Sequence, residues 1–134
     1  MDMEVTNFKK GDEAISQITQ KLSADKKSGV FWGIGAFTEA TIKVYDLGNK
    51  KYKEKNLSGN LEVASMTGIL SYIDGEPTIH VHVCLCDENF STYAGHLEKA
   101  IVGATLEVGF CQSKDLNREF NNEIGLNLLK IKED

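Results

Sequence analysis

The stretch IHVHVCLCD, residues 79–87, decides how the second half of the chain folds. Alternate residues of a β-strand point to opposite faces of a sheet. One face of this stretch is aliphatic and holds Ile79, Val81, Val83 and Leu85. The other face holds His80, His82, Cys84 and Cys86. The alternation predicts a strand whose aliphatic face packs into the core, while its histidines face a pocket.

The residues before this strand predict an antiparallel hairpin. Asp74-Gly75 is a strong turn signal, and residues 61–73 form an earlier strand run with apolar residues at Leu61, Val63 and Ile69. We expect residues 61–73 to pair with residues 78–86. Period-two patterns predict further strands at 29–46, 105–110 and 125–132.

Residues 11–29 predict the one clear helix. Ile15, Ile18 and Leu22 form a narrow apolar stripe at helical spacing. Acidic residues lie at the start and lysines near the end, as the helix dipole favours, and Gly29 is the expected stop. The fold class expected is α+β: a single domain over residues 1–134, mostly antiparallel β-sheet, with one main amphipathic helix.

Composition places the chain among ordinary globular domains. It has 134 residues, of which 41% are hydrophobic and 26% charged. No apolar run approaches the roughly 20 residues of a membrane span, and the N-terminus lacks a signal-peptide pattern. Three cysteines without framework spacing indicate free thiols in a reducing compartment. We expect a cytoplasmic protein without a membrane segment.

The charge pattern argues against tight DNA binding. The net charge is -5, and Arg118 is the chain's only arginine. The one compact basic stretch, Lys50–Lys55, is read as a solvated loop or hairpin, with a phosphate-contacting patch as the alternative. We therefore expect DNA binding by this chain alone to be weak or absent.

The histidines are the strongest candidates for a functional site. His80 and His82 lie on one strand face, about 6.6 Å apart, so both can reach one metal ion. His96, the only other histidine, follows Gly95, which would let the backbone turn closely. Solvent-facing histidines, or histidines hydrogen-bonded in an interface, would give the same pattern.

The sequence also suggests roles for the acidic residues and cysteines near this site. Glu62 and Glu107 are the first candidates to accept hydrogen bonds from the ligands' second ring nitrogens. Cys84 and Cys86 are read as core or interface residues rather than ligands or a redox pair. No nucleophile elbow, phosphate loop or dinucleotide fingerprint occurs, so catalytic residues are unknown.

Several motifs together resemble the PPC (plants and prokaryotes conserved) domain family over roughly residues 5–131. They are G-x-x-E-V-x-S-x-x-G at 59–68, H-x-H at 80–82, G-H-L at 95–97 and T-x-E-V at 105–108. The resemblance implies an antiparallel α+β fold, a homotrimer, and a cluster of His80, His82 and His96 that can hold a metal such as zinc. The family usually has two glycines before the third histidine, and here the first is Ala94.

The resemblance leaves three functions open. The first is a trimeric domain that binds a metal or small ligand, with no established reaction. The second is a DNA-associated regulatory protein, as the family's frequent label suggests, although the AT-hook core Arg-Gly-Arg-Pro of the plant members is absent. The third is a metal-dependent enzyme, because three histidine ligands leave a zinc position open for water.

Overall fold

A computed structural model describes residues 2–130. Its elements are β1 Met3–Lys9, α1 Ala14–Leu22, a 3-10 turn Ala24–Lys26, β2 Ser28–Asp46, β3 Lys51–Ile73, β4 Glu76–Cys86, β5 Thr92–Ser113, β6 Arg118–Asn121 and β7 Leu126–Leu129. β1 to β5 form one antiparallel sheet in the order β1-β5-β2-β3-β4, while β6 and β7 form a separate hairpin. The predicted α+β class with a mostly antiparallel sheet and one main helix is confirmed.

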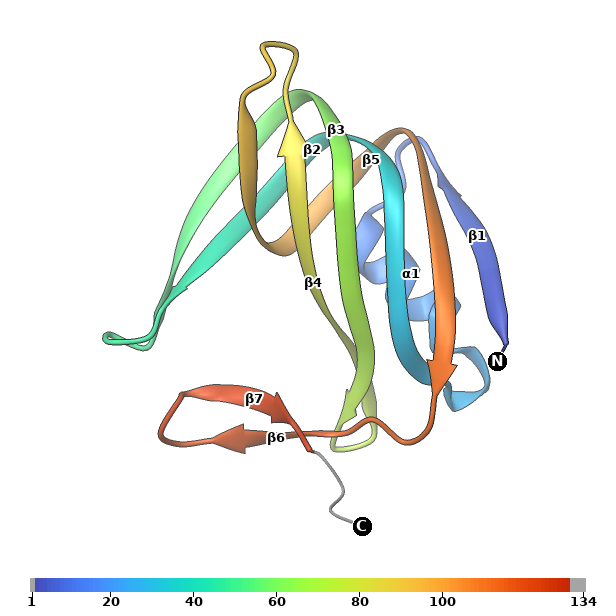
Figure 1. Cartoon of the computed structure of the whole chain (residues 1–134), viewed down its shortest axis with the longest axis vertical. Coiled ribbons are helices and arrows are strands. Elements are labelled where there is room, and N and C mark those ends of the chain that lie inside the picture. The colour runs from blue at the N-terminus through green and yellow to red at the C-terminus, as the bar shows by residue number, and fades with distance from the viewer. Residues whose placement is uncertain (1, 131–134) are drawn as a thin grey trace.

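The long strand β5 closes the sheet on itself (Figure 1). Its first part pairs with β4, and its later part pairs with β2 and β1. The pairing of β2 with its neighbours shifts register around Gly35, as expected where a strand bends. Gly35 has φ +156, and a Cβ there would lie 2.1 Å from the carbonyl oxygen of Thr105, so only glycine fits. The closure brings the start of β5 beside β4.

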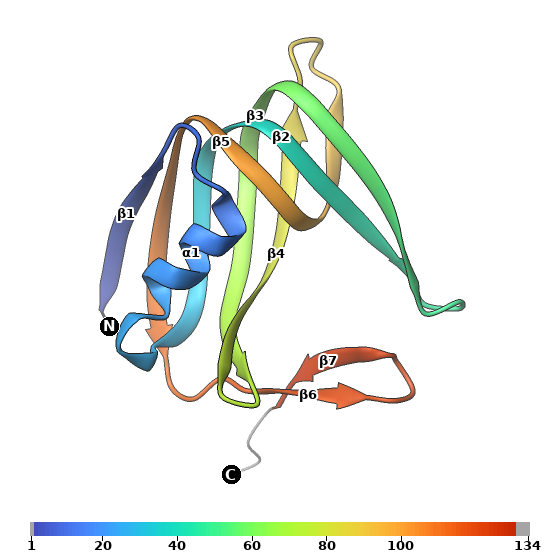
Figure 2. The ribbon, with the colours of Figure 1, turned by 180° about the vertical axis from the view of Figure 1, so that it is seen from behind.

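Helix α1 covers the inner face of the curved sheet (Figure 2). The Glu13 carboxylate caps it by accepting hydrogen bonds from the amides of Ile15 and Ser16, at 3.0 and 2.9 Å. The same carboxylate accepts from the amide of Ala100 in β5, which fixes the helix to the sheet. The buried helix residues are Ala14, Ile18 and Leu22.

The aliphatic face of β4 packs into this core as predicted. Val81, Val83 and Leu85 are buried, and Ile79 packs against the same cluster from its edge. The hairpin expected between residues 61–73 and 78–86 is also present, as β3 and β4. The alternation in residues 79–87 therefore identified the right strand and the right face.

The helix ends earlier than predicted. It stops at Leu22, and Asp25 with φ 59 lies in the left-handed region in the turn that follows. Gly29 belongs to β2, where a Cβ would lie 2.2 Å from the carbonyl oxygen of Cys111. Close strand packing, not a helix end, requires this glycine.

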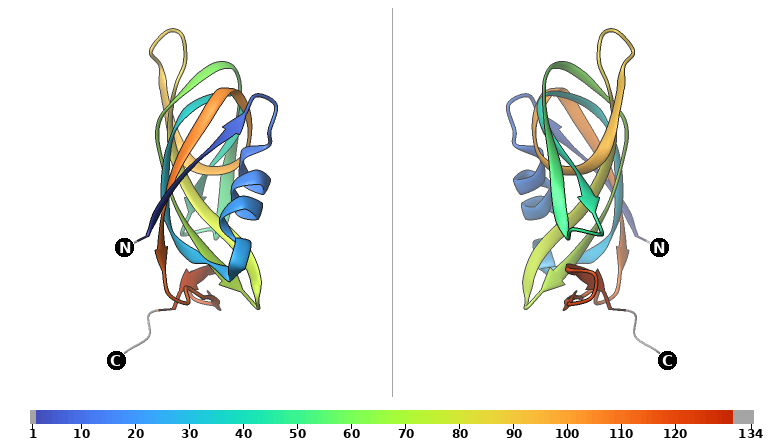
Figure 3. Two further views of the ribbon diagram at one scale, coloured as in Figure 1. Left: turned by 90° about the vertical axis from the view of Figure 1, so that its right-hand side faces the viewer. Right: turned by 90° about the vertical axis from the view of Figure 1, so that its left-hand side faces the viewer.

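The outer face of the sheet carries an exposed apolar surface, which we call the outer apolar face. Within residues 2–130 no helix covers it, and Figure 3 shows α1 on the other side. Its members, from β1 and β2, are Met3, Val5, Val30, Trp32 and Ile34, with exposed fractions of 41% to 75%. The ring of Trp32 lies over Gly109, where a Cβ would be only 2.4 Å away.

Other predicted segments differ in extent. The strand expected at 105–110 is the end of the much longer β5, and the one expected at 125–132 is β7, with residues 131 and 132 outside the described range. The Lys50–Lys55 stretch forms the end of the β2–β3 hairpin, which agrees with the expected solvated loop or hairpin. Among residues 2–130 no helix is long and apolar enough to span a membrane.

Candidate metal centre

Strand pairing brings the three histidines together. His80 and His82 lie on β4, and His96 lies on β5 directly opposite His82. Gly95 is therefore not in a turn, as the sequence suggested, but inside a strand. A Cβ at Gly95 would lie 2.8 Å from the carbonyl oxygen of Lys43, so the residue allows β5 to pass close to β2.

The imidazole nitrogens are spaced for a shared metal ion. One ligand atom from each histidine lies within 4.8 Å of the other two. The Nε2 atoms of His80 and His82 are 3.1 Å apart. Two nitrogens bound tetrahedrally to zinc at 2.0–2.1 Å would be about 3.3 Å apart. The side chains already have nearly the separation that a common ion requires.

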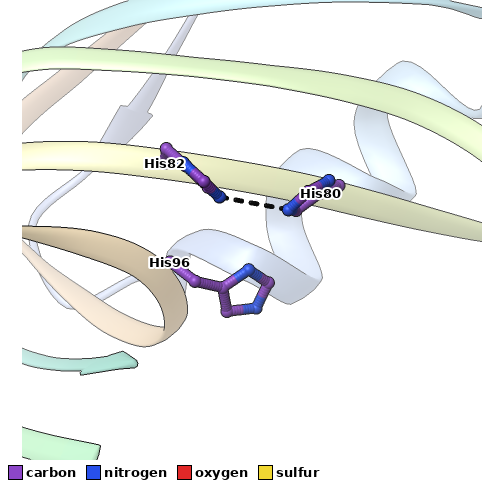
Figure 4. Close-up of side chains that lie close together, drawn as sticks. All are labelled: His80, His82 and His96. Atoms are coloured by element: carbon purple, nitrogen blue, oxygen red, sulfur yellow. Dashed lines mark hydrogen bonds between the residues drawn. The ribbon is translucent and has the colours of Figure 1, made fainter. Parts of the chain in front are cut away.

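His96 has a buried ring nitrogen that lacks a partner. Its Nδ1 makes no hydrogen bond with any described residue. In Figure 4 the ring nitrogen next to Cγ, which is Nδ1, faces the other two imidazoles. A buried polar atom without a partner is unfavourable. A metal ion would accept the Nδ1 lone pair and remove this penalty, so the donor set fits a metal.

The carboxylate beside the cluster is Glu98. Its Oε2 lies 3.8 Å from Nε2 of His96 and 3.3 Å from Nζ of Lys43. A carboxylate on the second ring nitrogen is the usual way to orient a ligand histidine. Glu62 and Glu107, the residues expected in this role, lie elsewhere along the strands. Glu62 pairs with Cys86, four residues beyond His82 on β4, and Glu107 pairs with Ile34.

The surroundings of His80 and His96 favour the neutral imidazole. Burial, followed by the positive charge of Arg118 and the neighbouring histidines, lowers the pKa of His80 to about 4. Burial also lowers the pKa of His96, and Glu98 opposes that shift in part. Neutral imidazoles are the form that binds metals, so proton competition at these two ligands is weak near pH 7.

Aromatic and aliphatic side chains wall the pocket that the histidines line. The pocket has a volume of about 350 Å³. Its lining includes Tyr45, Tyr52, Val44 and Leu126. The ring of Tyr52 lies 5.6 Å from that of His96. Tyr52 comes from the basic stretch, where the lysines on either side of it are exposed. Because neighbouring residues of a strand point to opposite faces, the exposed lysines on either side of Tyr52 could have predicted that its ring points away from them.

The hairpin of β6 and β7 closes one side of the site and contributes Arg118. The Tyr45 hydroxyl donates to the carbonyl of Ile124 at 2.6 Å, and Nζ of Lys50 donates to that of Asn122 at 3.0 Å. Arg118 lines an adjoining pocket with His80 and His96. From the sequence, Arg118 mattered only as evidence against DNA binding.

The cysteines stay outside the three-histidine group. Cys84, Cys86 and Cys111 are free thiols and half-buried. Cys84 and Cys86 continue the histidine face of β4 but pair with Ala94 and Thr92. Their half-buried positions agree with core or interface residues better than with ligands.

Residues 1–113 match the family model of the Plants and Prokaryotes Conserved domain. The chain belongs to this family. A candidate DNA-binding protein from Ralstonia eutropha is 31% identical, with a TM-score of 0.87, and the match covers 96% of this chain and 90% of that one. No curated protein sequence matches the chain significantly.

Two further solved structures share the fold of this chain. A metal-containing protein from Archaeoglobus fulgidus is 29% identical with a TM-score of 0.89, covering 98% of this chain and 94% of that one. A candidate DNA-binding protein from Bacteroides thetaiotaomicron is 25% identical with a TM-score of 0.91, covering 96% and 91%.

Proposed function

We propose that this domain binds one divalent metal ion through His80, His82 and His96. The observation that carries the proposal is the convergence of three imidazole nitrogens within 4.8 Å. The unpartnered Nδ1 of His96 and the metal-containing relative from Archaeoglobus fulgidus support it. Zinc is the first candidate, because it favours nitrogen ligands at these separations.

Three protein ligands leave a coordination position open, as in catalytic zinc sites. Catalysis would also need a general base beside that position. Glu98, the carboxylate beside His96, is 3.3 Å from Nζ of Lys43 and so is already paired. We therefore propose a metal site that binds a small ligand, and no specific reaction.

Metal analysis tests the site. The full chain, purified without a polyhistidine tag, is stripped with a chelator, offered zinc and dialysed. We expect about one zinc per chain, and none for His82→Ala. Cys84→Ser, two residues along the same face of β4, is the matched control and should retain zinc. If the wild type retains none, the 3.1 Å contact is a hydrogen bond between imidazoles and no metal site exists.

We propose further that the domain works as a homotrimer joined through the outer apolar face. Trp32 is 43% exposed and Ile34 59% exposed, and contiguous apolar surface of this kind marks an interaction site. The number three comes from the resemblance to the family, whereas the exposed face supports association itself. Light scattering should give three times 14.8 kDa, about 44 kDa. Trp32→Glu should shift the mass to the monomer, and a wild-type monomer at micromolar concentration would contradict the proposal.

DNA binding is the weaker candidate, although two relatives are named for it. The net charge is -5, and the only arginine lines the adjoining pocket with His80 and His96 rather than an open basic surface. We expect no nanomolar, sequence-selective binding at physiological salt. A fluorescence anisotropy titration against duplex DNA that gave such an affinity would reverse this order of preference.

A further inference from the structure

Two hydrogen bonds hold Arg118 in the adjoining pocket that it lines with His80 and His96. Its Nε donates to the hydroxyl of Ser71 at 2.8 Å, and Nη1 donates to the carbonyl of Asn127 at 3.2 Å. Ser71 is fully buried, so the first bond anchors the guanidinium to the core. A guanidinium has five N–H donors. Two are used in these bonds, and the remaining three make no hydrogen bond with residues 2–130.

The positive charge of Arg118 has no partner among residues 2–130. No carboxylate of that range lies within 4 Å of its guanidinium, whereas Lys27 and Lys130 each have one and Lys43 has two. The side chain is half-buried, and burial lowers its pKa. A half-buried cation without a counter-ion is unfavourable, and a metal ion on the histidines would add more positive charge nearby. The site therefore favours an anion.

The walls around Arg118 limit the size and kind of that anion. The pocket that it lines with His80 and His96 has a volume of about 320 Å³. Its other walls include Tyr52, Ile79 and Leu126. A space of this size suits a small metabolite, and the mixture of apolar walls with one charged group is typical of small-molecule sites.

We propose that Arg118 is the anion-binding residue of this site, and that the natural ligand is a small carboxylic acid. The planar guanidinium fork matches a planar carboxylate, which can accept two parallel hydrogen bonds. The rest of the ligand would extend toward the histidines and approach the open coordination position of the metal. This inference rests on the proposed metal site, and it adds the chemical class of the ligand.

Calorimetric titrations of the zinc-loaded full chain test the inference. The probes are acetate, lactate, pyruvate and succinate, with lactamide as the uncharged match for lactate and inorganic phosphate as a different anion. We expect at least one carboxylate to bind saturably, with lactate tighter than lactamide. Arg118→Gln should weaken carboxylate binding by about tenfold or more, the range for a charged hydrogen bond, without changing the zinc content.

Ser71→Ala is the control for a purely structural role of Arg118. It removes the anchor of Nε but keeps the guanidinium, so it should weaken carboxylate binding less than Arg118→Gln does. Equal binding of lactate and lactamide, or unchanged binding in Arg118→Gln, would overturn the proposal. Phosphate binding tighter than every carboxylate would overturn the carboxylate class.

Zinc analysis separates this proposal from the metal site. If the wild type holds no zinc, the metal proposal fails, and the same titrations are made on the metal-free chain. Carboxylate binding that depends on Arg118 would then still support the anion site, and its absence would end it.

Discussion

Acidification of the metal-free protein should destabilise it through His80. The pKa of His80 is lowered from 6.5 to about 4 in the folded chain, mainly by burial and the charge of Arg118. Between those two values the unfolded chain binds more protons than the folded chain. The free energy of unfolding therefore falls as the pH falls from about 7 to 4. The stability that the neutral His80 provides is fully present near pH 7 and is lost near pH 4.

The magnitude follows from the two pKa values. A difference from 6.5 to about 4 corresponds to about 3 kcal/mol if fully expressed. The ring of His80 is only partly buried and the residue as a whole is exposed, so solvent screening reduces the effect, and we expect about 1 kcal/mol. Part of this loss should disappear in His80→Gln, which carries no titratable imidazole.

Two measurements check this reasoning. Proton NMR of the metal-free chain gives the pKa of each histidine, and only three are present to assign. Urea unfolding in the presence of a chelator, at fixed protein concentration between pH 7 and 4, gives the stability slope. A pKa of 6.5 for His80 would refute the argument, as would equal pH slopes for wild type and His80→Gln.

Three further results are expected. Gly95→Ala should weaken zinc binding and lower stability, because its Cβ would lie 2.8 Å from the Lys43 carbonyl and displace His96; calorimetry and thermal melts measure both. Leu85→Ala should lower the free energy of unfolding by about 2–5 kcal/mol in urea titrations while zinc content stays the same, since Leu85 is fully buried on the other face of β4. Zinc at a free concentration of 100 times its dissociation constant should stabilise the wild type by about 2.7 kcal/mol in the same titrations, and His82→Ala should show no such gain.

Sequence-based prediction was most accurate where the local hydrophobic pattern and the tertiary packing favour the same strand and the same buried face. In β4 the alternation of residues 79–87 agrees with the buried face observed, with no irregularity in the strand between His80 and His82. The turn signal at Asp74-Gly75 then fixed the hairpin with β3. The alternation also placed His80 and His82 on one face, whereas the expectation that His96 joins them came from the resemblance to the family, because His96 reaches His82 through the pairing of β4 with β5.

Prediction failed where a strand changes its facing or where a partner is distant in sequence. β2 shifts register near Gly35 and again near Phe37, so a single parity could not describe its buried face. Glu98 was missed because its role depends on the pairing of β4 with β5, which no local pattern reveals. Arg118 was missed for the same reason, since its anchor Ser71 is 47 residues away.

The register of the sheet links the histidine cluster to the outer apolar face. Trp32 on β2 is paired with Thr67 on β3, and Thr67 is paired with His82 on β4, so all three side chains project from the same face. Two strand spacings separate Trp32 from His82, about 10 Å. A second copy that covered Trp32 would therefore approach the metal site.

Metal binding and assembly would then be thermodynamically coupled, because each changes the surroundings of the other's site, and such coupling is reciprocal. If assembly strengthens zinc binding, zinc must strengthen assembly by the same factor. The mass of the wild type, measured with and without zinc, therefore tests this coupling. A difference shows that the outer face and the histidines act as one unit, and equal masses show that they act independently.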